Sequence, residues 1–291
     1  MVGSDNILLC SDLDRTLIPN GFQQESAHAR LVFRRLAETA NIYLAYVSGR
    51  DQKLILDAIE ECYLPEPDYD IGDVGTTLYR VTNGYWQLSK DWSYEIGKDW
   101  KGLNGEGLAE FLEDMDDIRL QEPEKQSPYK LSFYTDQDVD QQRLIKQIRI
   151  VLDEKGVRAN IIWSVDEIST NGLLDIVPAR ANKLHAIQFL MQQEQFSGGR
   201  TVFAGDSGND LDVLTSGLQA ILVKNASEDV RKEAIDSLSA VSMTNCLYLP
   251  KGNFCGMNGN YAAGVLEGLA HFVPETKKII ANAVEKVKCL P

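Results

Sequence analysis

The chain has 291 residues, of which 44% are hydrophobic and 25% charged, and its formal net charge at pH 7 is −14. This composition is typical of a folded globular protein and excludes disordered, collagen-like and fibrous classes. The negative charge disfavours nucleic acid and anionic lipid as partners, because no basic stretch offsets it. We therefore expect neither nucleic acid nor a membrane as a partner.

The first residues contain no basic stretch ahead of an apolar run, and no segment stays apolar for the roughly eighteen residues that a membrane span needs. The five cysteines are odd in number, widely spaced and not arranged in metal-binding pairs. These features predict a cytoplasmic protein without a disulfide framework or a zinc site.

The first elements alternate between strand and helix. Residues 7–10 form a short apolar run without polar alternation, which is typical of a strand buried on both faces. A mostly helical apolar spacing over 31–37 precedes a second buried strand at 42–47. Strand, helix, strand is the unit of a parallel sheet. The same pattern returns with strands at 201–204 and 220–223, and a last helix follows.

The middle of the chain has a different pattern. Asn83-Gly84 separates two apolar segments, and this pair predicts a β-hairpin because both residues tolerate positive φ. Two further helices are predicted around 108–115 and 144–152, and three strands at 130–134, 159–163 and 173–177. We therefore predict an α/β fold: a Rossmann-like parallel-sheet core, residues 1–84 and 179–291, with an inserted α+β cap, residues 85–178.

Two carboxylates, Asp12 and Asp14, directly follow the first predicted strand, and Thr16 comes next in the same pattern. Like charges this close repel unless a cation holds them, and oxygen-rich carboxylate clusters are what Mg²⁺ selects. The alternative interpretation is a solvated acidic turn.

Three more polar patterns follow predicted strands or begin a helix. Ser48-Gly49-Arg50 offers a hydroxyl and backbone N–H groups that can hold phosphate oxygens, although Ser-Gly alone indicates only a turn. Lys183 begins a predicted helix and can reach a phosphate, or it is an ordinary surface lysine. Gly205-Asp206-Ser207-Gly208-Asn209-Asp210 places two further carboxylates on a glycine-rich turn. Because the carboxyl ends of parallel strands line one crevice, these distant residues can meet.

Asp12-x-Asp14-x-Thr16, Ser48, Lys183 and Gly205-Asp206-x-x-x-Asp210 resemble the four signature motifs of the haloacid dehalogenase superfamily. The insertion resembles the Cof-type cap of that superfamily. The segments 127–134, 175–183, 205–210 and 270–272 look most like bacterial sucrose-phosphate phosphatases. The chain departs from the pattern at Arg15, where Asn is expected, and at Ser48, where Thr is more usual in the sucrose enzymes.

The resemblance implies roles for these residues. Asp12 would be the nucleophile that forms an aspartyl-phosphate, Asp14 the general acid and base, and Lys183 a catalytic cation that grips the phosphoryl group. Mg²⁺ would be held by Asp12, the backbone carbonyl of Asp14 and Asp206. Asp210 would belong to the same metal site, where it and Asn209 would orient the loop or a metal-bound water. The residues expected to bind phosphate or substrate are Thr16, Ser48, Gly49, Arg50, Lys130, Asn209 and Asn225.

These roles predict a Mg²⁺-dependent phosphatase for a sugar phosphate, most of all sucrose 6-phosphate, with that small molecule as its partner. We expect a monomer, although the sequence does not determine the oligomeric state. The alternatives are a phosphatase for another glycosyl phosphate such as mannosylfructose phosphate, a phosphomannomutase-like phosphotransferase, and a non-enzymatic sugar-phosphate sensor. A sensor only binds its ligand, so it has no need for the general acid and base that Asp14 would supply. The lysines of residues 273–291 are expected on a solvated helix face, and the role of that segment stays open.

Overall fold

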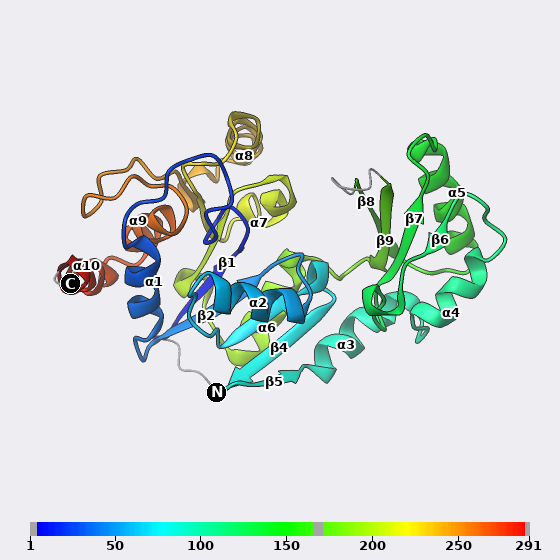
Figure 1. Cartoon of the computed structure of the whole chain (residues 1–291), viewed down its shortest axis with the longest axis horizontal. Coiled ribbons are helices and arrows are strands. Elements are labelled where there is room, and N and C mark those ends of the chain that lie inside the picture. Colours follow the sequence, from blue (N-terminus) through cyan, green and yellow to red (C-terminus); the bar gives the residue numbers. More distant parts are fainter. Residues whose placement is uncertain (1–4, 166–170, 289–291) are drawn as a thin grey trace. The chain divides into compact units, whose positions relative to one another are not determined.

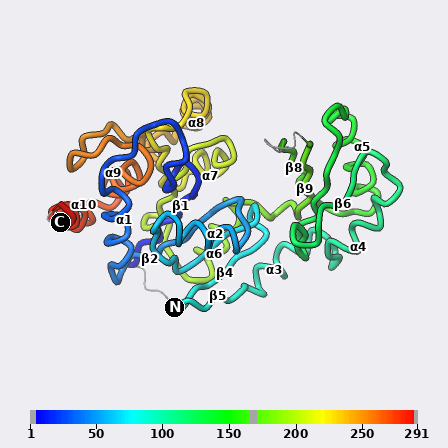
Figure 2. The backbone as a smooth tube through the Cα atoms, viewed as in Figure 1, coloured from blue at the N-terminus to red at the C-terminus, as the bar shows by residue number. Residues whose placement is uncertain are grey.

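The structure is a computed structural model that describes residues 5–165 and 171–288. The chain forms two compact units: residues up to Leu88 together with those from Lys183 onward make the first, and Ser89–Asn182 make the second. Figure 2 follows the backbone through the two connections between the units, after Leu88 and before Lys183.

The described strands of the first unit form an eight-stranded sheet in the order β12-β11-β10-β1-β2-β3-β4-β5. Their bounds are β1 (Ile7–Ser11), β2 (Ile42–Val47), β3 (Tyr69–Gly72), β4 (Thr77–Thr82), β5 (Tyr85–Leu88), β10 (Thr201–Gly205), β11 (Gln219–Leu222) and β12 (Leu247–Tyr248). Neighbours from β12 to β3 run parallel, whereas β4 and β5 are antiparallel additions at one edge. The predicted parallel-sheet core is therefore confirmed.

Helices cover both faces of this sheet (Figure 1). Their bounds are α1 (Ala29–Ala37), α2 (Gln52–Glu61), α6 (Lys183–Glu194), α7 (Leu211–Leu214), α8 (Glu228–Ala240), α9 (Ala262–Phe272) and α10 (Thr276–Lys288). One face, with Leu9, Leu44 and Val202, packs with α1, α2, α9 and α10 into a single apolar core. On the other face, α6 contacts β3, and α7 contacts β10 and β11. Because both faces are covered, β1 and β10 are buried at every position.

The C-terminal segment forms α10, which lies beside α1 and α9 (Figure 1). The lysines of this helix are exposed, as expected from the sequence. Its opposite face buries Ile280, Val284 and Val287 in the main core, a role that the sequence left open. The segment therefore completes the first unit.

The predicted hairpin is present: β4 and β5 pair around Asn83 (φ 51°) and Gly84 (φ 76°). The predicted boundaries of the insertion, at 84/85 and 178/179, differ from the unit boundaries at 88/89 and 182/183. The physical reason at the first boundary is that β5 hydrogen-bonds to β4 and so belongs to the core sheet.

The second unit is an antiparallel sheet in the order β6-β7-β9-β8, with helices packed against it. Its elements are α3 (Lys90–Gly97), α4 (Gly105–Ala109), β6 (Arg119–Leu120), β7 (Leu131–Thr135), α5 (Gln141–Glu154), β8 (Ala159–Val165) and β9 (Gly172–Pro178). Trp100, Phe133 and Ile148 lie in its own apolar core. This unit has the α+β composition expected of the insertion.

Short 3₁₀ turns complete the description: η1 (Asp73–Gly75), η2 (Lys98–Trp100), η3 (Glu110–Leu112), η4 (Pro123–Lys125), η5 (Gly198–Arg200), η6 (Gly208–Asp210) and η7 (Thr244–Cys246). Within the described ranges, no helix has both the length and the apolar character needed to cross a bilayer. The expected cytoplasmic location and monomeric state stay predictions.

Candidate active site

Asp12, Ser48 and Asp206 each occupy the first position after a strand of the parallel sheet. The strands β2, β1 and β10 are neighbours, and Ser11 lies opposite Tyr46 on one side and Ala204 on the other. Parallel strands end at the same edge, so the register places the three polar side chains at that edge.

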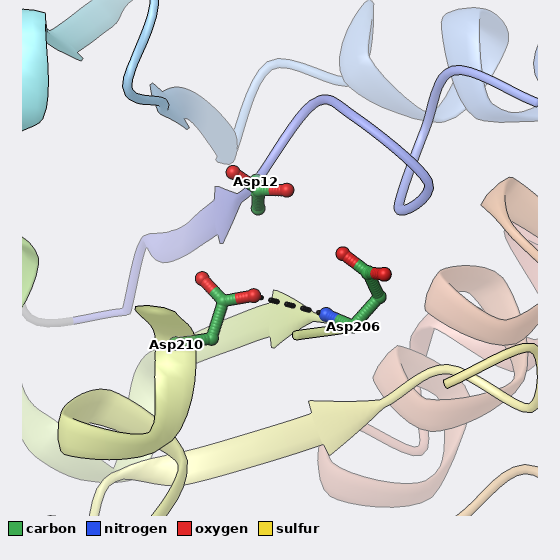
Figure 3. A group of neighbouring side chains, drawn as sticks. All are labelled: Asp12, Asp206 and Asp210. Carbon is green, nitrogen blue, oxygen red and sulfur yellow. Dashed lines mark hydrogen bonds between the residues drawn. The ribbon is translucent and has the colours of Figure 1, made fainter. Parts of the chain in front are cut away.

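Three buried carboxylates, Asp12, Asp206 and Asp210, form a cluster at this edge (Figure 3). Each offers an oxygen, and these oxygens all lie within 4.8 Å of one another. One oxygen of Asp210 accepts from the backbone N–H of Asp206 at 3.0 Å, which fixes the turn after β10 (Figure 3). The loop geometry therefore holds the carboxylates together despite their repulsion.

Gly205 is required for this turn. A Cβ at Gly205 would lie 2.5 Å from Oδ2 of Asp210, which is closer than any real contact of that kind. The glycine of the sequence motif is thus explained by the carboxylate that packs onto its backbone.

Lys183, the first residue of α6, supplies the buried ammonium of the cluster. Its Nζ lies 2.8 Å from Oδ1 of Asp12 and 2.7 Å from Oδ1 of Asp210. Burial alone would lower the pKa of Lys183, but the charges of Asp210 and Asp12 raise it. The ammonium is therefore charged and offsets one of the three carboxylates.

The pKa values of Asp12 and Asp206 show that Lys183 does not offset all the negative charge of the cluster. Burial raises the pKa of Asp12 to about 7 even though Lys183 lowers it. Burial and the charge of Asp210 raise the pKa of Asp206 to about 6. A cluster short of positive charge with an all-oxygen donor set fits a hard divalent cation. These three residues could hold a metal ion.

The Asp14 carboxylate lies apart from this cluster. It accepts hydrogen bonds from Nε and Nη2 of Arg50 at 2.8 and 2.7 Å, and from Nδ2 of Asn20 at 2.8 Å. Burial would raise the pKa of Asp14, but the bidentate pair with Arg50 outweighs it and lowers the pKa. The expected metal contact of Asp14 rests on its backbone carbonyl, which the family resemblance implies, and stays a prediction.

Sequence reasoning missed Asn20. Its only signal is a position six residues after Asp14, in a Pro-Asn-Gly turn. Both polar atoms of its side-chain amide are used, because Nδ2 donates to Asp14 and Oδ1 accepts from the N–H of Arg15 at 2.8 Å. Asn20 therefore shapes the loop after β1.

Thr16 is buried between two carboxylates. Its Oγ1 lies 3.4 Å from Oδ2 of Asp12 and 3.4 Å from Oδ1 of Asp206. A hydroxyl has one hydrogen, so it can donate to only one of them at a time. Its expected contact with phosphate stays a prediction.

An open cavity of about 330 Å³ gives access to the cluster. It is lined by Asp12, Asp14, Arg15, Ser48, Gly49, Arg50, Leu54, Asp206, Ser207 and Asn209. The Ser48 hydroxyl accepts from the N–H of Arg50 at 3.2 Å, which leaves its own hydrogen available to an anion. Asn209 lies at the rim, with Oδ1 3.5 Å from Nζ of Lys183.

Two of the predicted substrate contacts are not among the residues that line this cavity. The Asn225 amide donates to the carbonyl of Arg15 at 2.7 Å and accepts from the N–H of Tyr261 at 2.8 Å, so it joins two loops. Lys130 belongs to the second unit, where it lines a separate cavity of about 320 Å³. For both residues, substrate binding stays a prediction.

This fold, with a carboxylate at a strand end that faces a lysine and two further carboxylates, defines a hydrolase of the haloacid dehalogenase class. The family model for sucrose-6F-phosphate phosphohydrolase matches residues 5–273. The chain belongs to that family. Membership places it among the phosphoric monoester hydrolases that act on sugar phosphates.

Relatives agree with this assignment. The chain is 58% identical to a HAD-like hydrolase of Nitrosococcus oceani over 93% of its own length and 73% of that protein. It is 28% identical to mannosylfructose-phosphate phosphatase of Agrobacterium fabrum over 91% and 96% of the two chains. It is 26% identical to sucrose-phosphatase 2 of Nicotiana tabacum over 93% of this chain, and it spans only 60% of that protein.

A solved structure has the same architecture. The sucrose-phosphatase of Synechocystis sp. PCC6803, in complex with sucrose and phosphate, superposes with a TM-score of 0.66 and 26% identity. The match covers 92% of this chain and 98% of that one.

Proposed function

We propose that the chain hydrolyses sucrose 6-phosphate to sucrose and inorganic phosphate, with Mg²⁺ and through an aspartyl-phosphate on Asp12. The observation that carries this proposal is the contact of Asp12 with Lys183, within a buried cluster that has two further carboxylates. Family membership supports the sugar-phosphate substrate.

Asp12 would act as the nucleophile. One of its carboxylate oxygens attacks phosphorus, the new P–O bond forms, and the bond to the sugar oxygen breaks. Lys183 holds Oδ1 at 2.8 Å and would also offset the charge of the phosphoryl oxygens. Water then attacks the aspartyl-phosphate and releases phosphate.

Asp14 would give its proton to the departing sugar oxygen and then accept a proton from the attacking water. In its pair with Arg50 the carboxyl group is ionised, because the pKa of Asp14 is lowered. The acid role therefore requires Arg50 to release Asp14. The planar guanidinium would then be available to phosphate oxygens, whose geometry it suits.

Mg²⁺ would be held by Asp12 and Asp206, with Asp210 beside them, and when bound it would neutralise charge on the phosphoryl oxygens. Ser48 would donate its hydroxyl hydrogen to the same phosphoryl group. Two unit charges about 4 Å apart have an interaction energy of about 4 kcal/mol at an effective dielectric of 20. The energies of such contacts are therefore large enough to matter for catalysis.

The second unit would act as the cap that recognises the sugar, with Lys130 as one of its contacts. The aromatic side chains of Tyr129 and Trp163 are partly buried against the apolar core of the second unit, which gives them a structural function there.

One relative favours a second candidate substrate. Mannosylfructose-phosphate phosphatase is 28% identical to this chain and is matched over 96% of its length. We therefore propose mannosylfructose phosphate as the alternative substrate.

The test is a measurement of phosphate release from sucrose 6-phosphate, mannosylfructose phosphate, glucose 6-phosphate and mannose 6-phosphate, each with Mg²⁺ and with EDTA. We expect kcat/KM for sucrose 6-phosphate to exceed that of the monosaccharide phosphates by at least about tenfold, because the sugar contacts differ. Transfer of phosphate to another sugar would indicate a phosphotransferase. Binding without turnover of any substrate would indicate a sensor, and either result would contradict the proposal.

A further inference from the structure

Arg15 has a backbone conformation that is unusual for its residue type. Its φ is 57°, in the left-handed region that favours Gly and Asn. The N–H of Arg15 donates to Oδ1 of Asn20 at 2.8 Å, and its carbonyl accepts from Nδ2 of Asn225 at 2.7 Å. Contacts from both sides therefore fix the direction in which the side chain leaves the backbone.

The side chain of Arg15 points to the carboxylate cluster. Its Nε lies 3.3 Å from Oδ2 of Asp206, whose side chain is only 4% exposed. The ammonium of Lys183 is bound to Asp12 and Asp210 instead. Among the charged side chains that the structure describes around the cluster, Arg15 is thus the cation paired with Asp206.

The Arg15 side chain is 41% exposed and lines the cavity that leads to the cluster. It can therefore swing into the cavity without disturbing the core. A Mg²⁺ ion binds carboxylate oxygens at about 2.0–2.1 Å, so it would approach the same carboxylate and repel the guanidinium.

We propose that Arg15 is an internal counter-cation for Asp206 that Mg²⁺ has to displace, and that it thereby weakens the affinity of the site for the ion. This inference rests on the proposed function, which assigns Mg²⁺ to the cluster. Arg15 acts through Asp206 and is therefore a positioning residue that sets metal affinity.

The test is calorimetric titration of Mg²⁺ into the full chain without substrate, at constant ionic strength. Arg15→Asn and Arg15→Gly both remove the cation, and both replacements tolerate the positive φ, so either keeps the loop conformation. Arg35→Asn, at an exposed position of α1 that does not line this cavity, removes the same charge and is the control. We expect the Arg15 variants to bind Mg²⁺ about tenfold more tightly, and the control to stay within about twofold of the parent chain.

Unchanged or weaker Mg²⁺ binding in the Arg15 variants overturns the inference, and so does the absence of a binding signal in every chain. If Arg15→Asn does not fold, the titration of Arg15→Gly decides between these outcomes. Tighter binding without any phosphate release from the sugar phosphates would uphold the role of Arg15 while the proposed function fails. The two failures can therefore be told apart.

Discussion

The two units neutralise buried carboxylates in opposite ways. In the second unit, Asp99 accepts from the guanidinium of Arg158 and from the N–H of Arg180 at 2.7 Å, and the Arg180 guanidinium lies 3.7 Å away. Two cations thus face one carboxylate. In the first unit, three carboxylates share the buried ammonium of Lys183 and the partly exposed guanidinium of Arg15.

This difference distinguishes a buried carboxylate with a structural role from a cluster that can bind a cation. A buried carboxylate that its own unit neutralises fully, such as Asp99, ties segments of the chain together. A buried cluster with more carboxylates than cations is held at an energetic cost, and this cost is relieved when a cation binds. The comparison makes four predictions, of which the first concerns the nucleophile.

Asp12→Asn should give the largest effect, a loss of phosphate release of at least about 10³-fold, because the amide cannot form the aspartyl-phosphate. The free energy of unfolding should stay the same or rise, since the variant removes a charge from an under-neutralised cluster. Phosphate-release kinetics and urea denaturation measure the two effects.

Asp212→Asn, the same change at an exposed position of α7, is the matched control and should alter neither quantity. Activity that survives in Asp12→Asn would refute the nucleophile assignment.

Asp99→Ala tests the structural role of the fully neutralised carboxylate in the second unit. It should lower the free energy of unfolding of the second unit by about 2 kcal/mol, because two arginines lose their buried partner. Mg²⁺ binding by the first unit should not change. Urea denaturation and calorimetry are the measurements, and Asp138→Ala, at an exposed position, is the control. A loss below about 0.5 kcal/mol, the size typical of surface substitutions, would show that Asp99 is not a structural anchor.

Proton release should accompany Mg²⁺ binding near pH 6. The pKa values of Asp12 and Asp206, about 7 and about 6, lie above the ordinary 3.8, so the folded metal-free state carries protons that the ion must expel. For the same reason, the stability of the metal-free fold should fall as pH rises from about 4 to about 7, because the folded state binds more protons than the unfolded state.

Titrations in buffers of different ionisation enthalpy should show about one proton released per ion at pH 6 and almost none above pH 8. Equal binding heats in all buffers at pH 6 would mean that the cluster is already fully ionised without the ion. This result would contradict the inference that the cluster lacks positive charge and Asp99 does not.

Asp70→Asn should give the smallest effect at pH 5, a gain of about 1 kcal/mol in the free energy of unfolding. Both carboxyl oxygens of Asp70 are buried without a hydrogen-bond partner in the described part of the chain, and burial raises its pKa well above the ordinary value. Since ionisation of such a group destabilises the fold, the gain should grow from pH 5 to pH 8.

Urea denaturation at both pH values measures this gain, and Asp57→Asn on the exposed face of α2 controls for surface charge. A variant that is less stable than the parent chain at pH 8 would show that Asp70 has a stabilising role.

Much of the fold could be predicted from local patterns. The strands β1, β2 and β10 are short, continuous apolar runs, and such runs are typical of parallel strands buried on both faces. The strand β3 was missed, because Asp70 interrupts the apolar pattern of Tyr69–Gly72 with a charged residue. Helix α2 was missed as well, because it buries only Ile55 and Ala58 and therefore has a weak apolar face.

The sequence by itself determined which polar residues stand at the ends of core strands, because the apolar runs and the parallel arrangement place them at one edge. Only the tertiary structure decided their partners: Lys183 with Asp12 and Asp210, Arg15 with Asp206, and Arg50 with Asp14. Most of these pairs join residues far apart in the chain, and each forms only when packing brings two side chains within a few ångströms. No local pattern encodes that distance.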